Sequence, residues 1–241
     1  MEEKYLIKVK VWGEFACFTR PDLKVERMTY PCMTPSAARG ILDSILWKPE
    51  FMWHVHRINV LKPIRFFSVK RNEISSKQGS NPIVIDAVDK SGKPKNRVQR
   101  NSIVLKDVAY IIEASVVMNG YSENNTPKKY MEMFNRRVKK GQCYRRPYLG
   151  CREFSAEFSE PDDSDHSIPE TIPIGSMLLD LFYDDQGQPS PRYFYDVKIE
   201  EGVLNCSEAY QEILSSSHFQ PEHSDEVEKL IKELDGRGAE E

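Results

Sequence analysis

Three consecutive residues, Lys128, Lys129 and Tyr130, form the part of the sequence best suited to acid–base chemistry at a phosphate. They follow Thr126-Pro127, which predicts the start of a helix, because threonine caps helix N-termini and proline favours the first helical position. Unpaired backbone N–H groups attract anions in such a first turn. RNA cleavage by a neighbouring 2′-hydroxyl needs a base, an acid and positive charge at phosphorus. A lysine pair with a tyrosine could supply all three without a metal.

A basic run continues from this turn to Arg152. Between Pro127 and Arg152 there are nine basic residues and one acid, Glu132. Cations that follow phosphates, interleaved with rings on which unpaired bases stack, are typical of RNA-binding grooves. A basic surface helix with core tyrosines is the alternative interpretation. The candidate RNA-binding residues, two of them outside this run, are Arg39, Lys48, Arg136, Arg137, Lys139, Lys140, Tyr144, Arg145, Arg146 and Arg152.

Charge is divided unevenly along the chain. Residues up to Arg152 contain 29 Lys and Arg against 14 Asp and Glu, whereas residues from Glu153 onward contain 5 against 23. Lysine and arginine gain affinity for polyanions by releasing condensed counterions, so the first part is a candidate polyanion binder. Charge alone leaves open the alternative of a basic domain beside an unrelated acidic tail.

Other patterns argue against several classes of protein. The five cysteines never occur as C-x-x-C, which disfavours a disulfide framework and a structural zinc site. No Walker loop, G-x-S-x-G elbow or H-E-x-x-H is present, and we expect neither a metal nor a cofactor. No apolar stretch approaches the ~20 residues that span a bilayer. The N-terminus lacks a secretory pattern, so we expect a cytoplasmic protein without a membrane partner.

His54 and His56 are a secondary candidate for chemistry. They lie two residues apart in an expected strand and therefore share one face. The pair is compatible with metal binding or proton transfer, but no third ligand at a suitable spacing accompanies it. A structural role for both histidines is the favoured interpretation.

Caps and hydrophobic periodicity predict the elements that position these residues. Helices are expected to begin at Thr34-Pro35 and at Thr126-Pro127, and to end near Lys48-Pro49 and Gly141. Strands or strand-like segments are predicted at residues 5–12, 51–61, 108–118 and 148–158. Their order is that of a ferredoxin-like or RRM-like domain, which places the chain in the α+β class. Residues 62–106 interrupt this order as a long basic hairpin insertion.

The remainder of the chain is expected to be a separate, smaller unit. An acidic loop should lead into paired strands at residues 177–183 and 193–199. We therefore predict an RRM-like RNA-binding and processing domain at 1–158, the acidic loop and a small antiparallel β unit at 159–215, and a polar C-terminal tail at 216–241. The tail contains a short amphipathic helix with Val227, Leu230, Ile231 and Leu234.

Several ordered motifs together identify a family. They are VWGEFACFTRP at 11–21, TPSAARGIL at 34–42, WKP at 47–49, KKGQC at 139–143 and LGCREF at 149–154. In this order they resemble the CRISPR-associated Cas-five family of subtype I-C, also called the d or c variant, over roughly residues 4 to 205. Several ordered motifs are more specific than any single one.

The resemblance implies a function and partners. Members of this family have an RRM-like N-terminal domain and a β-rich C-terminal part. They cut the repeat stem-loop of precursor CRISPR RNA without a metal and stay bound to its 5′ handle. They thereby cap the Cascade complex, beside the Cas-seven backbone subunits and the Cas-eight large subunit, and meet target DNA indirectly. The chain is therefore expected to be a metal-independent endoribonuclease in antiviral defence.

The family pattern also assigns catalytic positions. An aromatic residue or histidine late in the first helix falls on Leu46, and a Lys-His pair falls on Lys128 and Lys129. Lysine is retained at the second position, whereas Leu46 cannot move a proton and Lys129 replaces the histidine. Catalysis is thus assigned to Lys128, Lys129 and Tyr130. The alternatives are a non-catalytic handle-binding capping subunit of the same complex and a general RNA-binding module.

Overall fold

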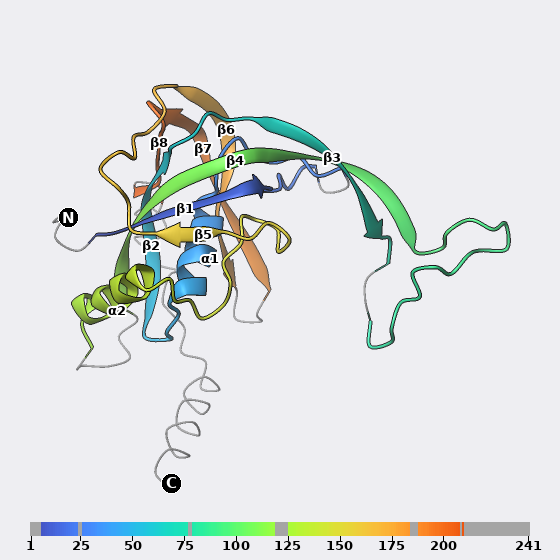
Figure 1. Cartoon of the computed structure of the whole chain (residues 1–241), viewed down its shortest axis with the longest axis horizontal. Coiled ribbons are helices and arrows are strands. Elements are labelled where there is room, and N and C mark those ends of the chain that lie inside the picture. The colour runs from blue at the N-terminus through green and yellow to red at the C-terminus, as the bar shows by residue number, and fades with distance from the viewer. Residues whose placement is uncertain are drawn as a thin grey trace, which may run out of the picture.

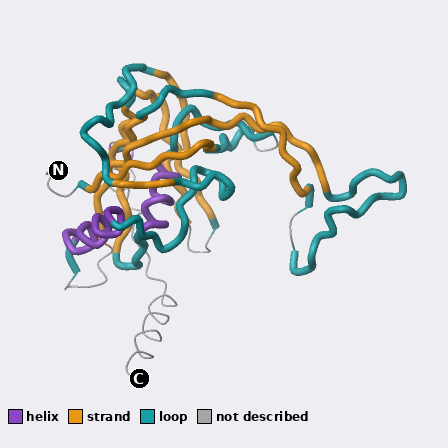
Figure 2. The backbone as a smooth tube through the Cα atoms, in the orientation of Figure 1, coloured by secondary structure: helices purple, strands orange, loops and turns teal. Residues whose placement is uncertain are grey.

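The computed structural model describes residues 6–23, 26–76, 79–118, 125–183, 188–207 and Ala209. In this part of the chain, one eight-stranded antiparallel sheet carries two helices (Figures 1 and 2). The strand order is β5-β1-β4-β2-β8-β7-β6, and β3 pairs with β4 off this path. The elements are β1 (Ile7–Ala16), α1 (Pro35–Ile45), β2 (Phe51–Val60), β3 (Phe66–Ile74), β4 (Arg97–Met118), α2 (Pro127–Lys139), β5 (Glu157–Ser159), β6 (Ile172–Tyr183), β7 (Pro189–Glu200) and β8 (Val203–Asn205). The architecture is α+β, as predicted.

Both helices begin where the sequence places their caps. The Thr34 hydroxyl oxygen accepts a hydrogen bond from the Ala37 N–H at 3.2 Å, and that of Thr126 accepts one from the Lys129 N–H at 3.4 Å. Each bond satisfies one of the donors left unpaired at a helix start. Proline follows each cap at a position that has no N–H to lose.

The helices bury their apolar faces against β1, β2 and β4. Leu42, Ile45, Phe134 and Val138 belong to the same core cluster as the inward-facing residues of these strands. Trp53 connects the two helices, because its ring packs on Phe134 with centroids 4.8 Å apart and its indole N–H donates to the Leu46 carbonyl. The start of α2 and the end of α1 are therefore fixed on one aromatic cluster.

The basic insertion is a hairpin, as predicted, but its second strand is longer than the sequence suggests. β4 begins at Arg97 instead of residue 108, and it pairs with β3 from Ile74↔Arg97 to Phe66↔Leu105. These first residues of β4 are mostly polar, and those on the half-buried face include Arg100 and Ser102, so no apolar alternation marks them as a strand. The hairpin projects away from the body of the molecule (Figure 1).

The C-terminal strands continue the same sheet. β6 and β7 are longer than the predicted 177–183 and 193–199, and β8 joins them to β2 through the pairs Arg57↔Asn205 and Asn59↔Val203. The division into units at 1–158 and 159–215 stays a prediction. The predicted tail, 216–241, lies outside the described residues. No helix in the described ranges is long and apolar enough to cross a membrane.

Candidate nucleic-acid interface

The first turn of α2 presents two lysines to solvent. Lys128 has 76% of its side chain exposed and its Nζ lies 3.9 Å from Oε1 of Glu132. Lys129 is also exposed, and its Nζ donates to Asn125 Oδ1 at 2.6 Å and lies 5.6 Å from the centre of the Tyr130 ring. The structure therefore places two ammonium groups at a helix N-terminus, where an anion is favoured.

Tyr130 is buried, unlike these two lysines. Its side chain is 2% exposed, and its ring packs on Phe51 with centroids 4.7 Å apart. Burial, together with the negative charge and hydrogen bond of Glu50, raises the pKa of the Tyr130 hydroxyl. A phenol held in this way is poorly placed to exchange a proton with RNA. The structure thus brings Lys128 and Lys129 to the surface and does not bring Tyr130 there.

Leu46 closes the end of α1 as an apolar core residue. Its side chain is fully buried, its N–H donates to the Leu42 carbonyl at 2.9 Å, and its carbonyl accepts from Trp53. The position at which the family has an aromatic residue or histidine is therefore filled by packing in this chain, and no proton-transfer group takes its place at that point.

The last turn of α2 forms a second basic surface. Arg136, Lys139 and Lys140 are exposed, whereas Arg137 donates to the Ile45 carbonyl at 2.5 Å and so joins α2 to the end of α1. Cations near a helix C-terminus are favourable toward the helix dipole even without a ligand. The centres of the first and last turns are about 14 Å apart at 1.5 Å per residue, which is a length of a few nucleotides at about 3.4 Å per nucleotide along a strand.

The segment after α2 returns to the end of α1. The backbone N–H groups of Tyr144 and Arg145 both donate to the Ser44 carbonyl, at 2.9 and 3.0 Å. Tyr144 is 69% exposed, and the Arg145 guanidinium lies 5.8 Å from the centre of its ring. Arg146 forms an ion pair with Glu157 across the surface. Arg152 is exposed, so this segment carries cations and an open aromatic ring together.

Arg39 is engaged within the fold. Its Nε and Nη2 donate to the two carboxylate oxygens of Asp180 on β6, at 2.6 and 2.7 Å, and its Nη1 approaches Asp43 at 3.5 Å. Burial, opposed by the Arg39 charge, raises the pKa of Asp43 to about 6. The guanidinium of Arg39 therefore joins α1 to β6, and its predicted role in RNA binding stays a prediction. Lys48 is half-buried beside Pro49.

The two histidines stack on each other beneath the surface. Their ring centroids are 4.3 Å apart, and His56 contacts the Ser115 and Ser207 hydroxyl oxygens at 2.8 and 3.3 Å. Burial and the neighbouring His56 lower the pKa of His54 to about 4. Within the described residues no group of three or more His, Cys, Asp or Glu side chains could hold a metal ion. The pair contributes to packing between β2, β4 and the segment after β8.

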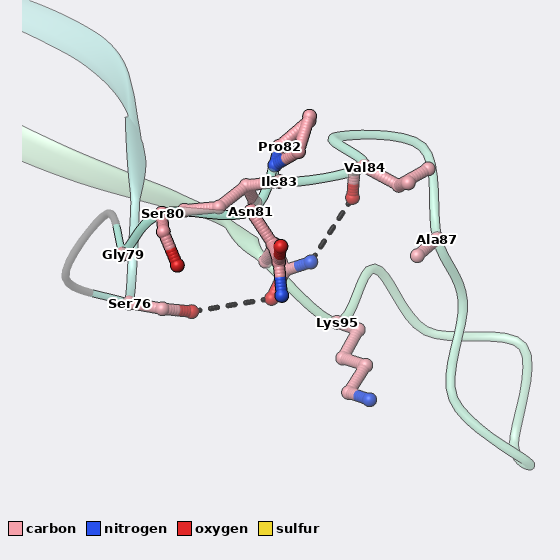
Figure 3. Close-up of a pocket in the computed structure, with 10 residues that line it drawn as sticks. Ser76, Gly79, Ser80, Asn81, Pro82, Ile83, Val84, Ala87 and Lys95 are labelled. Carbon is pink, nitrogen blue, oxygen red and sulfur yellow. Dashed lines mark hydrogen bonds between the residues drawn. The ribbon is translucent and has the colours of Figure 1, made fainter.

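A pocket lies elsewhere. It has a volume of about 470 Å³ at the far end of the β3–β4 hairpin, where Asn96 bonds to Ser76 and Val84 (Figure 3). Its walls come from the hairpin alone, including Asn81 and Lys95. The pocket is therefore separate from the basic surface of α2.

Sequence reasoning missed Trp47 and Glu50. Trp47 is 56% exposed and lies directly after α1. Glu50 lies in the same connection between α1 and β2, beside Tyr130. The WKP motif contains this tryptophan, but its sequence gives no sign of whether the indole is buried. The sequence signal that could have singled out Trp47 is the presence of a large, uncommon residue between the expected helix end and Lys48-Pro49.

Comparison with known proteins identifies the family. A model described as CRISPR-associated protein (Cas_Cas5) matches residues 6–203. The chain belongs to the Cas5 family. A protein of Thermus thermophilus named CRISPR pre-crRNA endoribonuclease Cas5d is 44% identical over 224 residues, covering 86% of this chain and 94% of the relative. One of the same name from Mannheimia succiniciproducens is 42% identical over 222 residues, covering 86% and 96%. These matches place the chain in subtype I-C of the Cas5 family, as the motifs predicted.

Solved structures share the fold at lower identity. A crystal structure titled as a CRISPR-associated protein has a TM-score of 0.59 and 22% identity, covering 83% of this chain and 90% of that one. A functionally uncharacterized Streptococcus mutans protein, SMU1763c, has a TM-score of 0.58 and 21% identity, covering 83% and 91%. The mostly antiparallel sheet with two helices is therefore a known Cas5-like architecture.

Proposed function

We propose that this chain is an endoribonuclease that cleaves the repeat of precursor CRISPR RNA without a metal ion. The observation that carries the proposal is the exposed lysine pair on the first turn of α2, in a chain whose relatives at 44% and 42% identity are named pre-crRNA endoribonucleases. The helix N-terminus would bind the scissile phosphate. Lys128 would stabilise its charge, and Lys129 would exchange protons with the attacking 2′-hydroxyl or the leaving oxygen.

The basic surfaces at the last turn of α2 and on residues 144–152 support a second part of the proposal. We infer that they hold the 5′ handle after the cut, because product release requires loss of several phosphate contacts together. The chain would remain in the cytoplasm as a subunit of the type I-C Cascade complex with the Cas-seven and Cas-eight subunits. It would meet target DNA only through that complex.

We also propose a finer description of the fold. The strands β5-β1-β4-β2 with α1 and α2 have the strand order of a ferredoxin-like unit, and β6 to β8 would form the smaller C-terminal unit. In this description α1 and α2 both belong to the ferredoxin-like unit. The proposed RNA-binding residues on α2 and after it would therefore also belong to that unit.

The direct test mixes purified protein with an RNA copy of one CRISPR repeat, called the repeat RNA below, in EDTA. One cut with a 2′,3′-cyclic phosphate on the upstream product is expected, because the neighbouring 2′-hydroxyl is the nucleophile. A scrambled RNA of equal composition should stay intact. Tight binding of the repeat RNA without any product at stoichiometric protein would refute cleavage and favour the capping-subunit alternative.

A further inference from the structure

Trp47 is a large aromatic side chain held in solvent. It is 56% exposed, whereas Trp53, six residues later, is 1% exposed. An indole has a large apolar surface, and removing that surface from water is favourable. A ligand that covers the exposed Trp47 ring would therefore gain this free energy of burial. In the described part of the chain the Trp47 ring takes part in no ring–ring or cation–π contact, unlike Trp12, which has the Lys10 Nζ 5.8 Å from its ring centre.

Hydrogen bonds anchor the backbone directly before Trp47. The Leu46 N–H continues the α1 hydrogen-bond ladder to Leu42, and the Leu46 carbonyl accepts from the Trp53 indole at 3.1 Å. Because Leu46 is anchored inside the core, the next residue must leave the helix end toward solvent. The exposure of Trp47 therefore results from the fold itself.

A second exposed ring lies at the same helix end. Tyr144 is 69% exposed, and its backbone is anchored to the Ser44 carbonyl within the last turn of α1. Arg145 lies against its ring, and Arg137 is bonded to the carbonyl of Ile45. Two open rings and two guanidinium groups are thus fixed around one turn of helix.

This helix end is adjacent to the first turn of α2. Phe51 opens β2 four residues after Trp47, and its ring packs on Tyr130, which directly follows the lysine pair. Burial and the Glu50 carboxylate, which lies in the same α1–β2 connection as Trp47, raise the pKa of the Tyr130 hydroxyl. An RNA strand with its phosphate at Lys128 and Lys129 would therefore have its neighbouring nucleotides near Trp47.

We propose that Trp47 and Tyr144 form a nucleobase-stacking site for unpaired bases of the RNA beside its stem. The inference rests on the proposed function and assigns the part of the substrate that these rings bind. Aromatic faces accept any base, while the surrounding cations hold the flanking phosphates. Stacking at Trp47 would fix which phosphate reaches the lysine pair, and so would set the cut position.

The test measures affinity for repeat RNA that the protein does not cut. If the wild type cleaves the RNA, the nucleotide before the cut is replaced by its 2′-deoxy form; if it does not, the RNA is used unmodified. Stacking of a base contributes about tenfold to affinity in comparable sites. Trp47→Ala is expected to weaken binding about tenfold and Trp47→Phe less than threefold. Tyr195→Ala, which removes a ring on β7 that is even more exposed than Trp47, is expected to leave binding unchanged.

Abasic nucleotides then identify the bound group. Removing the base that stacks on Trp47 should weaken RNA binding by the wild type about tenfold. The same abasic RNA should bind to Trp47→Ala as weakly as the intact RNA does. Unchanged binding of Trp47→Ala, or equal effects of every abasic position on both proteins, would overturn the proposal. Normal RNA binding with weakened assembly of the complex would assign Trp47 to a protein partner instead. Cleavage by the wild type is measured in a separate assay. If the protein does not cleave the RNA, the affinity measurements still test the stacking site.

Discussion

Replacing Arg39 with methionine should destabilise the fold far more than it weakens RNA binding. The Asp180 side chain is 2% exposed, and both of its oxygens accept hydrogen bonds from the Arg39 guanidinium. Removing one partner of a buried ion pair costs about 3–5 kcal/mol, because the other charge stays buried without its counter-ion. Arg39 itself is 25% exposed, so we expect a loss near the lower limit, about 3 kcal/mol.

Urea unfolding followed by tryptophan fluorescence measures this loss directly. A second substitution, Asp180→Leu, should recover most of it in the Arg39→Met background, since the buried charge is then removed as well. Arg136→Met is the matched control: Arg136 is an exposed arginine on α2, and its loss should change unfolding by less than about 0.5 kcal/mol while weakening RNA binding.

The reasoning would be refuted by the reverse pattern. If Arg39→Met unfolded like the wild type and lost more than tenfold in RNA affinity, Arg39 would be an RNA contact, as the sequence alone predicts. The ion pair with Asp180 would then contribute little to the fold.

Three further predictions concern Tyr130, His54 and Gly150. Tyr130→Phe should lower the cleavage rate less than fivefold in single-turnover assays, because the hydroxyl is buried; a loss of about a hundredfold or more would make it a proton donor. As the pH drops from about 6.5 toward 4, His54 should contribute a loss of stability, since unfolding lets it bind a proton that its lowered pKa excludes, while Asp43, whose pKa is raised to about 6, contributes in the opposite sense; the His54 contribution is therefore read as the difference between wild type and His54→Gln, which should grow as the pH falls in a series of urea melts. Gly150→Ala should lower the melting temperature by several degrees, because φ is +82° and the added Cβ would lie 2.1 Å from the Cys17 carbonyl oxygen. A melting temperature equal to that of wild type would contradict this.

Local signals in the sequence were sufficient for much of the fold. Thr34-Pro35 and Thr126-Pro127 mark the two helix starts, because a cap is formed within four residues of chain. The alternation in β1 reports one buried face. The first part of β4 lacks an apolar alternation because polar residues such as Arg100 and Ser102 occupy its less exposed face, so its pairing with β3 could not be seen.

The candidate site was only partly predictable, because exposure depends on distant contacts. Arg39 and Asp180 are 141 residues apart, and no local pattern links them. Tyr130 follows two exposed lysines, but its burial is decided by Phe51 on another strand. Trp47 and Trp53 are the same residue type six positions apart with opposite exposure. Charge patterning in the sequence identified the basic region from Lys128 to Arg152. The fold determined which side chains of that region are exposed and can contact RNA.

The lysine pair carries the central claim, and its removal tests that claim most directly. Single-turnover cleavage of the repeat RNA in EDTA is measured for wild type, Lys128→Ala, Lys129→Ala and the double variant, with Lys198→Ala, an exposed lysine on β7, as the control. The account predicts losses of about a hundredfold or more at either lysine, wild-type rates for Lys198→Ala, and binding of uncut RNA reduced only modestly. Cleavage by the double variant at the wild-type rate would contradict it.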